Sequence, residues 1–228
     1  GDDGAADVFV PERALTLEAF RTLGTDLGFV GRRSVRGGFQ RIAVTSATRG
    51  EGKTFTASNL AVTRASHGIR TLLIDADLRA RGVSRFLDMP HDLPGLSDVL
   101  LRTRGLRDTV RDVEVGPGKR LSVLPAGTSA PDPGMLLGSD EFWDLLHQQC
   151  SYYELVIVDT PPLSMLSDAT PVASWVDGVI VVVRSGMTDR SALDVTLDRL
   201  ERTGARIAGL VLNDAEIPTP YTRYAYGG

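Results

Sequence analysis

A glycine-rich loop near the start of the chain carries residues suited to holding a triphosphate. The segment Gly50-Glu51-Gly52-Lys53-Thr54 lies between an apolar run that ends at Ser46 and a stretch with a helical pattern. Glycines let the backbone approach an anion, and the N–H groups at a helix N-terminus bind phosphate. The Lys53 ammonium would reach the β- and γ-phosphates, and the Thr54 hydroxyl would ligate Mg²⁺. The loop therefore predicts a site for ATP and Mg²⁺.

Two aspartates follow the next apolar run, and a third follows a later one. Asp75 and Asp77 come after Leu72-Leu73-Ile74, and in extended geometry their side chains would share one side. Beside a triphosphate, one carboxylate would bind Mg²⁺ and the other would accept a proton from a substrate hydroxyl. The alternative is a solvated strand end whose carboxylates pair with Arg79.

Asp159 follows Leu155-Val156-Ile157-Val158, which is the Walker B form of four apolar residues and then an aspartate. This pattern places a carboxylate at the carboxyl edge of a parallel sheet, where open α/β sheets bind ligands. Asp159 is therefore predicted to hold Mg²⁺, through water, with capping of a helix as the structural alternative.

The elements that must position these residues alternate between strands and helices. A helix is expected from about Thr16, a strand over 41–46, and a helix from the loop to about His67. The further strands and helices are expected at 71–74, 121–124, 155–158, 178–183 and 207–212, and at 140–149 and 191–202, respectively. This alternation predicts an α/β fold of three layers, the P-loop NTPase fold, with a mainly parallel central sheet and helices on both faces.

The chain divides into three parts by its patterns. Residues 1–7 are small and acidic, so 1–14 is expected to be a linker or an artificial end, and residues 15–215 form one predicted domain. Within that domain, 82–118 is the least defined stretch, with a turn at Pro94-Gly95 and a short helix after it. Residues 216–228 contain two prolines and a terminal Gly-Gly, which predict a flexible tail.

Composition excludes several classes of function. The net charge of −4 and the pI of about 5.4 give no basic field that would draw the chain to nucleic acid. Cys150 is the only cysteine, so the chain has no internal disulfide and no cysteine-rich zinc site. The longest purely apolar stretch, 179–183, is far too short to span a membrane. A cytoplasmic protein is the expectation.

Together the loop 45–54, the segment Asp75 to Arg79 and the segment Asp159 to Pro162 resemble the Walker A, A′ and B motifs of the bacterial tyrosine kinases of polysaccharide export. Further segments that resemble this family are Leu124-Pro125-Ala126-Gly127, Leu136-Leu137 before Ser139, Ser167-Asp168-Ala169, and Gly209 to Asn213. The resemblance implies an ATP-dependent protein-tyrosine autokinase. Its implied catalytic residues are Lys53, Asp75, Asp77 and Asp159, and its implied Mg²⁺ ligands are Thr54, Asp75 and Asp159.

The tail contains three of the five tyrosines of the chain, Tyr221, Tyr224 and Tyr226. Such a C-terminal tyrosine cluster is a feature of the family, and the resemblance implies that these residues accept phosphate in the active site of a neighbouring copy. Each phosphate adds roughly −1.5 to −2 charges. We hypothesise that repulsion among these charges releases the tail, and counting tail phosphates against oligomer size tests this. The alternative interpretation is that the tail is a disordered end whose tyrosines bind other surfaces without specificity.

The resemblance also implies nucleotide contacts and partners. Arg184 and Asn213 would contact the adenine, while Arg49, Glu51 and Phe55, with the loop glycines Gly50 and Gly52, would surround the phosphates. The family works with a transmembrane activator, fused or separate, at the inner face of the cell membrane, and with a tyrosine phosphatase. Its members form rings through a first-helix motif, Glu-x-x-Arg-x-x-Arg, which reads Glu18-x-x-Arg21-x-x-Gly24 here.

The chain departs from usual patterns at several positions. Ala47 stands where the strict Walker A pattern has glycine, Arg49 where the family has proline, and Asp132 where it has asparagine. At Thr48, partition and septum-site ATPases carry a signature lysine, so Thr48 and the tyrosine tail argue against a switch ATPase of that class. A nucleotide-responsive assembly module with little kinase activity is the other alternative. Labelled tyrosine that is lost in Lys53→Met and in a tail deletion would separate the three.

Overall fold

The computed structural model describes residues 14–28, 39–90, 92–128, 130–163 and 170–215. Its strands are β1 (Arg41–Ser46), β2 (Thr71–Asp75), β3 (Arg111–Gly116), β4 (Lys119–Leu124), β5 (Leu155–Asp159), β6 (Gly178–Arg184) and β7 (Ile207–Asn213). Its helices are α1 (Ala14–Asp26), α2 (Lys53–Ser66), α3 (Gly82–Phe86), α4 (Leu96–Leu100), α5 (Leu106–Thr109), α6 (Pro133–Leu137), α7 (Asp140–Gln149), α8 (Thr170–Trp175) and α9 (Arg190–Arg202).

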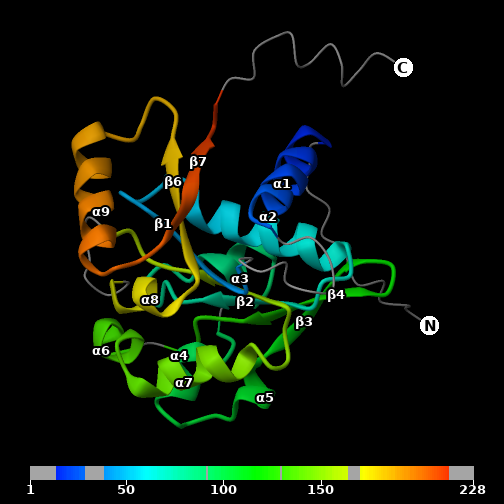
Figure 1. Ribbon diagram of the computed structural model, residues 1–228. Helices are drawn as coiled ribbons and strands as arrows, with labels where there is room; N and C mark the ends of the chain where they lie inside the picture. The colour runs from blue at the N-terminus through cyan, green and yellow to red at the C-terminus, as the bar shows by residue number, and fades with distance from the viewer. Residues whose placement is uncertain (1–13, 29–38, 91, 129, 164–169, 216–228) are drawn as a thin grey trace.

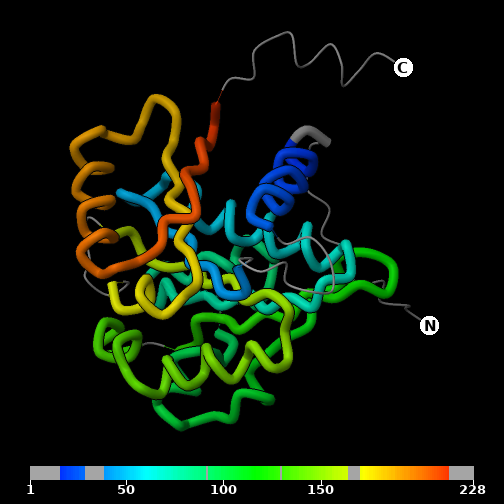
Figure 2. The backbone as a smooth tube through the Cα atoms, viewed as in Figure 1, coloured from blue at the N-terminus to red at the C-terminus, as the bar shows by residue number. Residues whose placement is uncertain are grey.

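The seven strands form one sheet in the order β3-β4-β2-β5-β1-β6-β7 (Figure 1). Every neighbouring pair is parallel except β3 and β4, which are antiparallel. β1 is an interior strand and lies between β5 and β6, which come more than 100 residues later in the chain (Figure 2). The carboxyl ends of β1, β2 and β5 therefore meet at one edge of the sheet, where a parallel sheet binds its ligands.

Two apolar cores pack against opposite faces of the sheet. Along β5, Val156 and Val158 enter one core, whereas Leu155 and Ile157 enter the other, because successive side chains of a strand point to opposite faces. Helices α1, α2 and α3 cover the second core, and α4, α6, α7, α8 and α9 cover the first (Figure 1). The predicted α/β fold, with three layers and a mainly parallel sheet, is confirmed.

The antiparallel strand β3 was absent from the sequence prediction. It lies in the poorly defined stretch 82–118 and, among the strands that the structure describes, pairs only with β4, through a turn at Gly118, where φ is +66°. An edge strand has one neighbour and is partly solvated, so it lacks the continuous apolar run of the buried strands. The short helices α3, α5, α6 and α8 were missed because four to six residues are too few to show a helical period.

Several expectations fall outside the described residues. These are residues 1–13 of the expected linker, Ser167-Asp168-Ala169, and the whole tail with its three tyrosines. The first helix begins at Ala14, two residues before the expected Thr16, and ends at Asp26. Among the helices that the structure describes, none is long and apolar enough to cross a membrane.

Candidate functional site

The phosphate loop turns from β1 into α2 through two glycines with positive φ. Gly50 has φ +84° and Gly52 has φ +98°, a conformation that side chains with a Cβ rarely adopt. Gly52 also lies against Asn213, because an added Cβ would stand 2.1 Å from the Asn213 Nδ2 atom. The loop thereby brings the N-terminus of α2, which begins at Lys53, to the ligand-binding edge of the sheet.

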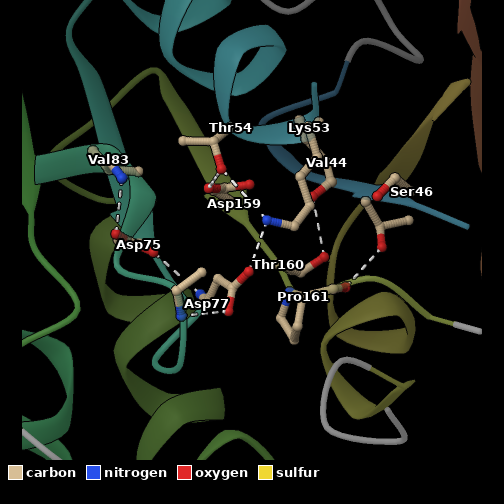
Figure 3. A network of polar contacts seen from close by, with 12 residues as sticks. Val44, Ser46, Lys53, Thr54, Asp75, Asp77, Val83, Asp159, Thr160 and Pro161 are labelled. Carbon is tan, nitrogen blue, oxygen red and sulfur yellow. Dashed lines mark hydrogen bonds and ion pairs between the residues drawn. The ribbon is translucent and has the colours of Figure 1, made fainter. Parts of the chain in front are cut away.

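Lys53 is held by a carboxylate of the A′ segment (Figure 3). Its Nζ lies 2.7 Å from Asp77 Oδ2, and the two side chains are only 11% and 5% exposed. Burial lowers the pKa of Lys53, but the charges of Asp159 and Asp77 outweigh this effect, so the net pKa is raised. The lysine is therefore charged and sits between two acids at the mouth of the phosphate loop.

Asp75 and Asp77 do not form the extended pair that the sequence predicted. β2 ends at Asp75, and the chain then turns so that Asp75 Oδ1 accepts a hydrogen bond from Asp77 N at 3.2 Å. Asp75 Oδ2 accepts a second from Val83 N at 3.0 Å, at the start of α3. Asp75 therefore anchors the segment that follows β2, whereas Asp77 reaches Lys53. Strand geometry could not foresee this turn, because the strand stops at Asp75.

Asp159 lies directly opposite Asp75 on the neighbouring strand and faces α2. Its Oδ2 accepts a hydrogen bond from the Thr54 hydroxyl at 2.6 Å. Its Oδ1 is buried and has no hydrogen-bond partner within the described part of the chain. Burial raises the pKa of Asp159 to about 6, with the Asp77 charge adding to the rise and Lys53 and Thr54 opposing it. Burial likewise raises the pKa of Asp75, helped by the charge of Asp159.

The orphaned oxygen of Asp159 beside the Thr54 hydroxyl fits a hard divalent cation such as Mg²⁺. Within the described ranges, no cluster of three or more His, Cys, Asp and Glu side chains could hold a metal ion alone. Mg²⁺ characteristically keeps waters and takes phosphate oxygens in addition to one or two carboxylates. The residues present therefore fit Mg²⁺ that arrives with a nucleotide.

Arg184 and Asn213, the residues expected at the adenine, are register partners at the ends of β6 and β7. Arg184 Nη1 donates to the Gly50 carbonyl at 3.1 Å, and its Nη2 lies 2.9 Å from Asp214 Oδ2. Asn213 Nδ2 donates to the Glu51 carbonyl at 3.0 Å. Both side chains thus reach the phosphate loop, and the structure brings the expected base and phosphate residues together.

The other expected neighbours of the phosphates have different surroundings. Phe55 packs edge-to-face between Phe20 of α1 and Phe86 of α3, with ring centroids 6.0 and 5.9 Å apart. Glu51 is fully buried and its carboxylate accepts hydrogen bonds within the loop, whereas Arg49 is exposed. Phe55 therefore links the phosphate-loop helix to α1 and α3, and the Glu51 carboxylate shapes the loop from inside.

The first-helix motif lies on α1. Glu18 and Arg21 form an exposed ion pair with a distance of 3.4 Å between Oε2 and Nη1. Gly24 is buried against α2, where an added Cβ would stand 2.8 Å from Arg64 Nη1. Gly24, the third position of the motif, therefore lies in the contact between α1 and α2.

Thr188 is a residue of the site that the sequence did not predict. Thr188 follows β6, and its hydroxyl donates to Glu51 Oε1 at 2.7 Å and accepts from Arg184 N at 2.7 Å. A threonine after a strand is common in loops, so only the tertiary contact marks it.

The sequence of this chain matches a known protein family and several known proteins. The model of the CobQ/CobB/MinD/ParA nucleotide binding domain matches residues 42–223. Tyrosine-protein kinase YwqD of Bacillus subtilis is 33% identical over 95% of this chain and 88% of its own length. Tyrosine-protein kinase CpsD of Streptococcus agalactiae is 31% identical over 87% of this chain and 83% of its own. The chain belongs to the bacterial tyrosine kinase family.

Solved structures agree with this membership. The kinase domain of the Escherichia coli tyrosine kinase ETK has a TM-score of 0.77 and 32% identity, over 88% of this chain and 78% of that one. The chimerical protein CapA2B2 has a TM-score of 0.79 and 32% identity, over 88% and 85%. MinD of Pyrococcus horikoshii, solved with Mg-ADP, has a TM-score of 0.63 at 22% identity, over 81% and 76%, and shares the fold alone. These bacterial tyrosine kinases favour protein-tyrosine kinase activity over the partition-type switch.

Proposed function

We propose that this chain is an ATP-dependent protein-tyrosine autokinase that phosphorylates Tyr221, Tyr224 and Tyr226 of a neighbouring copy. The observation that carries the proposal is the 2.7 Å contact between Lys53 Nζ and Asp77 Oδ2 at the mouth of the phosphate loop. It sets a carboxylate beside the lysine that reaches the transferred phosphate in P-loop enzymes. A carboxylate at that place can accept the proton of an incoming hydroxyl.

ATP would change the partners of Lys53. The ammonium contacts Asp77 in this structure, and the β- and γ-phosphate oxygens of a bound triphosphate would compete for the same charge. Asp77 would then face the tyrosine hydroxyl, while its Oδ1 stays fixed by the backbone N–H of Ala80 at 3.1 Å. Residues Arg184 and Asn213 hold the adenine in the proposal, as the family resemblance implies.

In the transfer step, the tyrosine oxygen forms a bond to the γ-phosphorus, and the bond between that phosphorus and the β–γ bridging oxygen breaks. The tyrosine proton passes to the Asp77 carboxylate, and ADP is the leaving group. Lys53 stabilises the charge on the phosphate oxygens throughout. Mg²⁺, when bound, neutralises part of the charge on the β- and γ-phosphates. We assign Thr54 and Asp159 to hold it, with Asp75 as the third candidate ligand.

The same geometry supports two alternative functions less well than kinase activity. In a switch ATPase of the partition type a signature lysine stands at Thr48, whereas here the Thr48 hydroxyl donates to Glu51 Oε1 at 3.0 Å. An assembly module without kinase activity gives no role to the contact between Asp77 and Lys53. The kinase proposal gives Asp77 the role of the base and needs no lysine at position 48.

The relatives suggest the location and the partners that we propose for this kinase. We propose residues 15–215 as the kinase domain and 216–228 as its phosphorylated tail. The kinase would act at the inner face of the cell membrane through a transmembrane activator, in regulation of exopolysaccharide synthesis and export. CapA2B2 is named as a chimera, which supports a partner protein for the kinase. Oligomers would form through Glu18 and Arg21, and a tyrosine phosphatase would reset the tail.

Mass spectrometry after incubation with Mg²⁺, ATP and an activator segment tests the proposal. Phosphate on one or more of the three tail tyrosines is the expected result, and Lys53→Met abolishes it. A variant with all three tail tyrosines changed to phenylalanine is the matched control for other acceptors. ATP turnover without any phosphotyrosine in the presence of the activator would instead support the switch ATPase.

A further inference from the structure

A carboxylate lies inside the phosphate loop rather than on its surface. The Glu51 side chain is fully buried. Its Oε2 accepts a hydrogen bond from Thr48 N at 2.8 Å, and its Oε1 accepts from the Thr48 hydroxyl at 3.0 Å. A negative charge beneath a loop that binds a triphosphate is unfavourable by itself, so its contacts must provide the compensation.

The two carboxylate oxygens of Glu51 match the three hydrogen-bond donors that surround them. The three donors are the Thr48 N–H, the Thr48 hydroxyl and the Thr188 hydroxyl. A carboxylate is acceptor-only and offers two oxygens, whereas the glutamine amide offers one oxygen and turns two N–H donors toward the remaining donors. Hydrogen bonds to charged groups are about twice as strong as neutral ones. Glu51 therefore holds the loop from inside through hydrogen bonds with Thr48 and Thr188. We call these three hydrogen bonds the clasp.

Thr188 connects Glu51 to the end of β6, on the other side of the site. Its hydroxyl donates to Glu51 Oε1 at 2.7 Å and accepts from Arg184 N at 2.7 Å, so the direction of both bonds is fixed. Two further bonds run in parallel, from Arg184 to the Gly50 carbonyl and from Asn213 to the Glu51 carbonyl. The ends of β6 and β7 are thus joined to the loop by three separate contacts.

We infer that Glu51 and Thr188 are positioning residues, which hold the phosphate loop against the ends of β6 and β7 so that ATP meets one preformed surface. The inference rests on the nucleotide site of the proposed function. A loop held in its bound geometry avoids the cost of ordering on binding, so the clasp contributes to nucleotide affinity. Neither side chain takes part in the transfer of phosphate.

The test compares Thr188→Val, which keeps the shape and removes the hydroxyl, with Thr188→Ser, which keeps the hydroxyl. Thr203→Val is the matched control, because the Thr203 hydroxyl bonds the Leu200 carbonyl at the end of α9. Binding of Mg-ADP is measured by calorimetry on each full-length variant, and the KM for ATP and kcat are measured with the activator segment. Glu51→Gln is measured in the same way as the second variant.

We expect Thr188→Val and Glu51→Gln to weaken Mg-ADP binding and raise the KM about tenfold, with kcat at saturating ATP within about threefold. Thr188→Ser and Thr203→Val stay within about twofold of the parent. Equal affinities for the valine and serine variants at position 188 would overturn the inference, as would a fall in kcat without a change in affinity. If the parent chain binds Mg-ADP but makes no phosphotyrosine, the proposed kinase activity fails while the inference is still tested by affinity.

Discussion

Asp75 and Asp159 stand directly opposite each other at the carboxyl ends of β2 and β5, and both are completely buried. Burial raises the pKa of both; the charge of Asp159 adds to the rise for Asp75, and the charge of Asp77 adds to the rise for Asp159. Lys53, with Asp77 behind it, is the cation that faces them. The site thus holds more negative charge than it neutralises until a cation arrives, and this imbalance governs how the protein responds to pH and to metal.

The free energy of unfolding of the metal-free protein should fall as the pH rises from about 4 to about 6. A carboxyl whose pKa is raised on folding favours the folded state while it is protonated, and that contribution is lost as the pH rises from the ordinary value near 3.8 through the folded value. For Asp159 this window ends at about 6. A rise of this size corresponds to about 3 kcal/mol.

Asp159→Asn isolates this effect. At pH 8 without Mg²⁺ we expect the variant to melt roughly 6 °C above the parent, because the buried charge is gone and the amide oxygen can still accept from Thr54. At pH 4.5 the difference should disappear. Mg²⁺ with ADP should reverse the order at pH 8, since only the parent keeps the carboxylate. Thermal unfolding monitored by circular dichroism measures all three conditions, and a variant that is less stable at pH 8 without Mg²⁺ would contradict the prediction.

Asp77→Asn should separate catalysis from nucleotide binding. Asparagine keeps the acceptor for the Ala80 N–H but cannot take a proton from tyrosine, so kcat should fall by about 10²- to 10⁴-fold. Lys53→Met removes the cation that reaches the phosphates and should lower both affinity and rate. Calorimetry with Mg-ADP and a phosphotyrosine assay distinguish the two variants. Unchanged phosphorylation in Asp77→Asn would exclude Asp77 as the base.

Gly52→Ala should abolish nucleotide binding. The new Cβ would have to displace the Asn213 amide, and the loop would have to leave its positive φ of +98°. Gly118→Ala is the control, because Gly118 also has a positive φ but has no atom within 4 Å of the added Cβ. We expect a loss of about 1–2 kcal/mol in the free energy of unfolding there, with normal affinity for Mg-ADP. Equal nucleotide affinity for both variants would contradict the prediction.

Gly24→Arg, which would complete the first-helix motif, should destabilise the monomer. Arg64 lies where the new side chain would begin, so α1 must shift or Arg64 must move away. Combining Gly24→Arg with Arg64→Ala should recover part of the loss, with a coupling energy of about 1 kcal/mol or more in a double-mutant cycle. Urea unfolding provides the energies. Strict additivity of the two changes would show that the positions do not interact.

The sequence by itself determined the fold class and the chemistry of the loop. Continuous apolar strands such as Leu155–Asp159 and a glycine-rich loop before a helix are local patterns that burial on both faces and anion binding each require. Edge strand β3 was not visible, because partial exposure leaves a strand without such a pattern.

Only the tertiary structure decided how the site residues are connected. Asp75 and Asp77 are two residues apart, yet one anchors α3 and the other meets Lys53, because the chain turns where β2 ends. The clasp between Glu51 and Thr188 joins residues 137 positions apart. Such a contact depends on the order of the strands in the sheet, which brings the end of β6 beside β1, and no local pattern encodes that order.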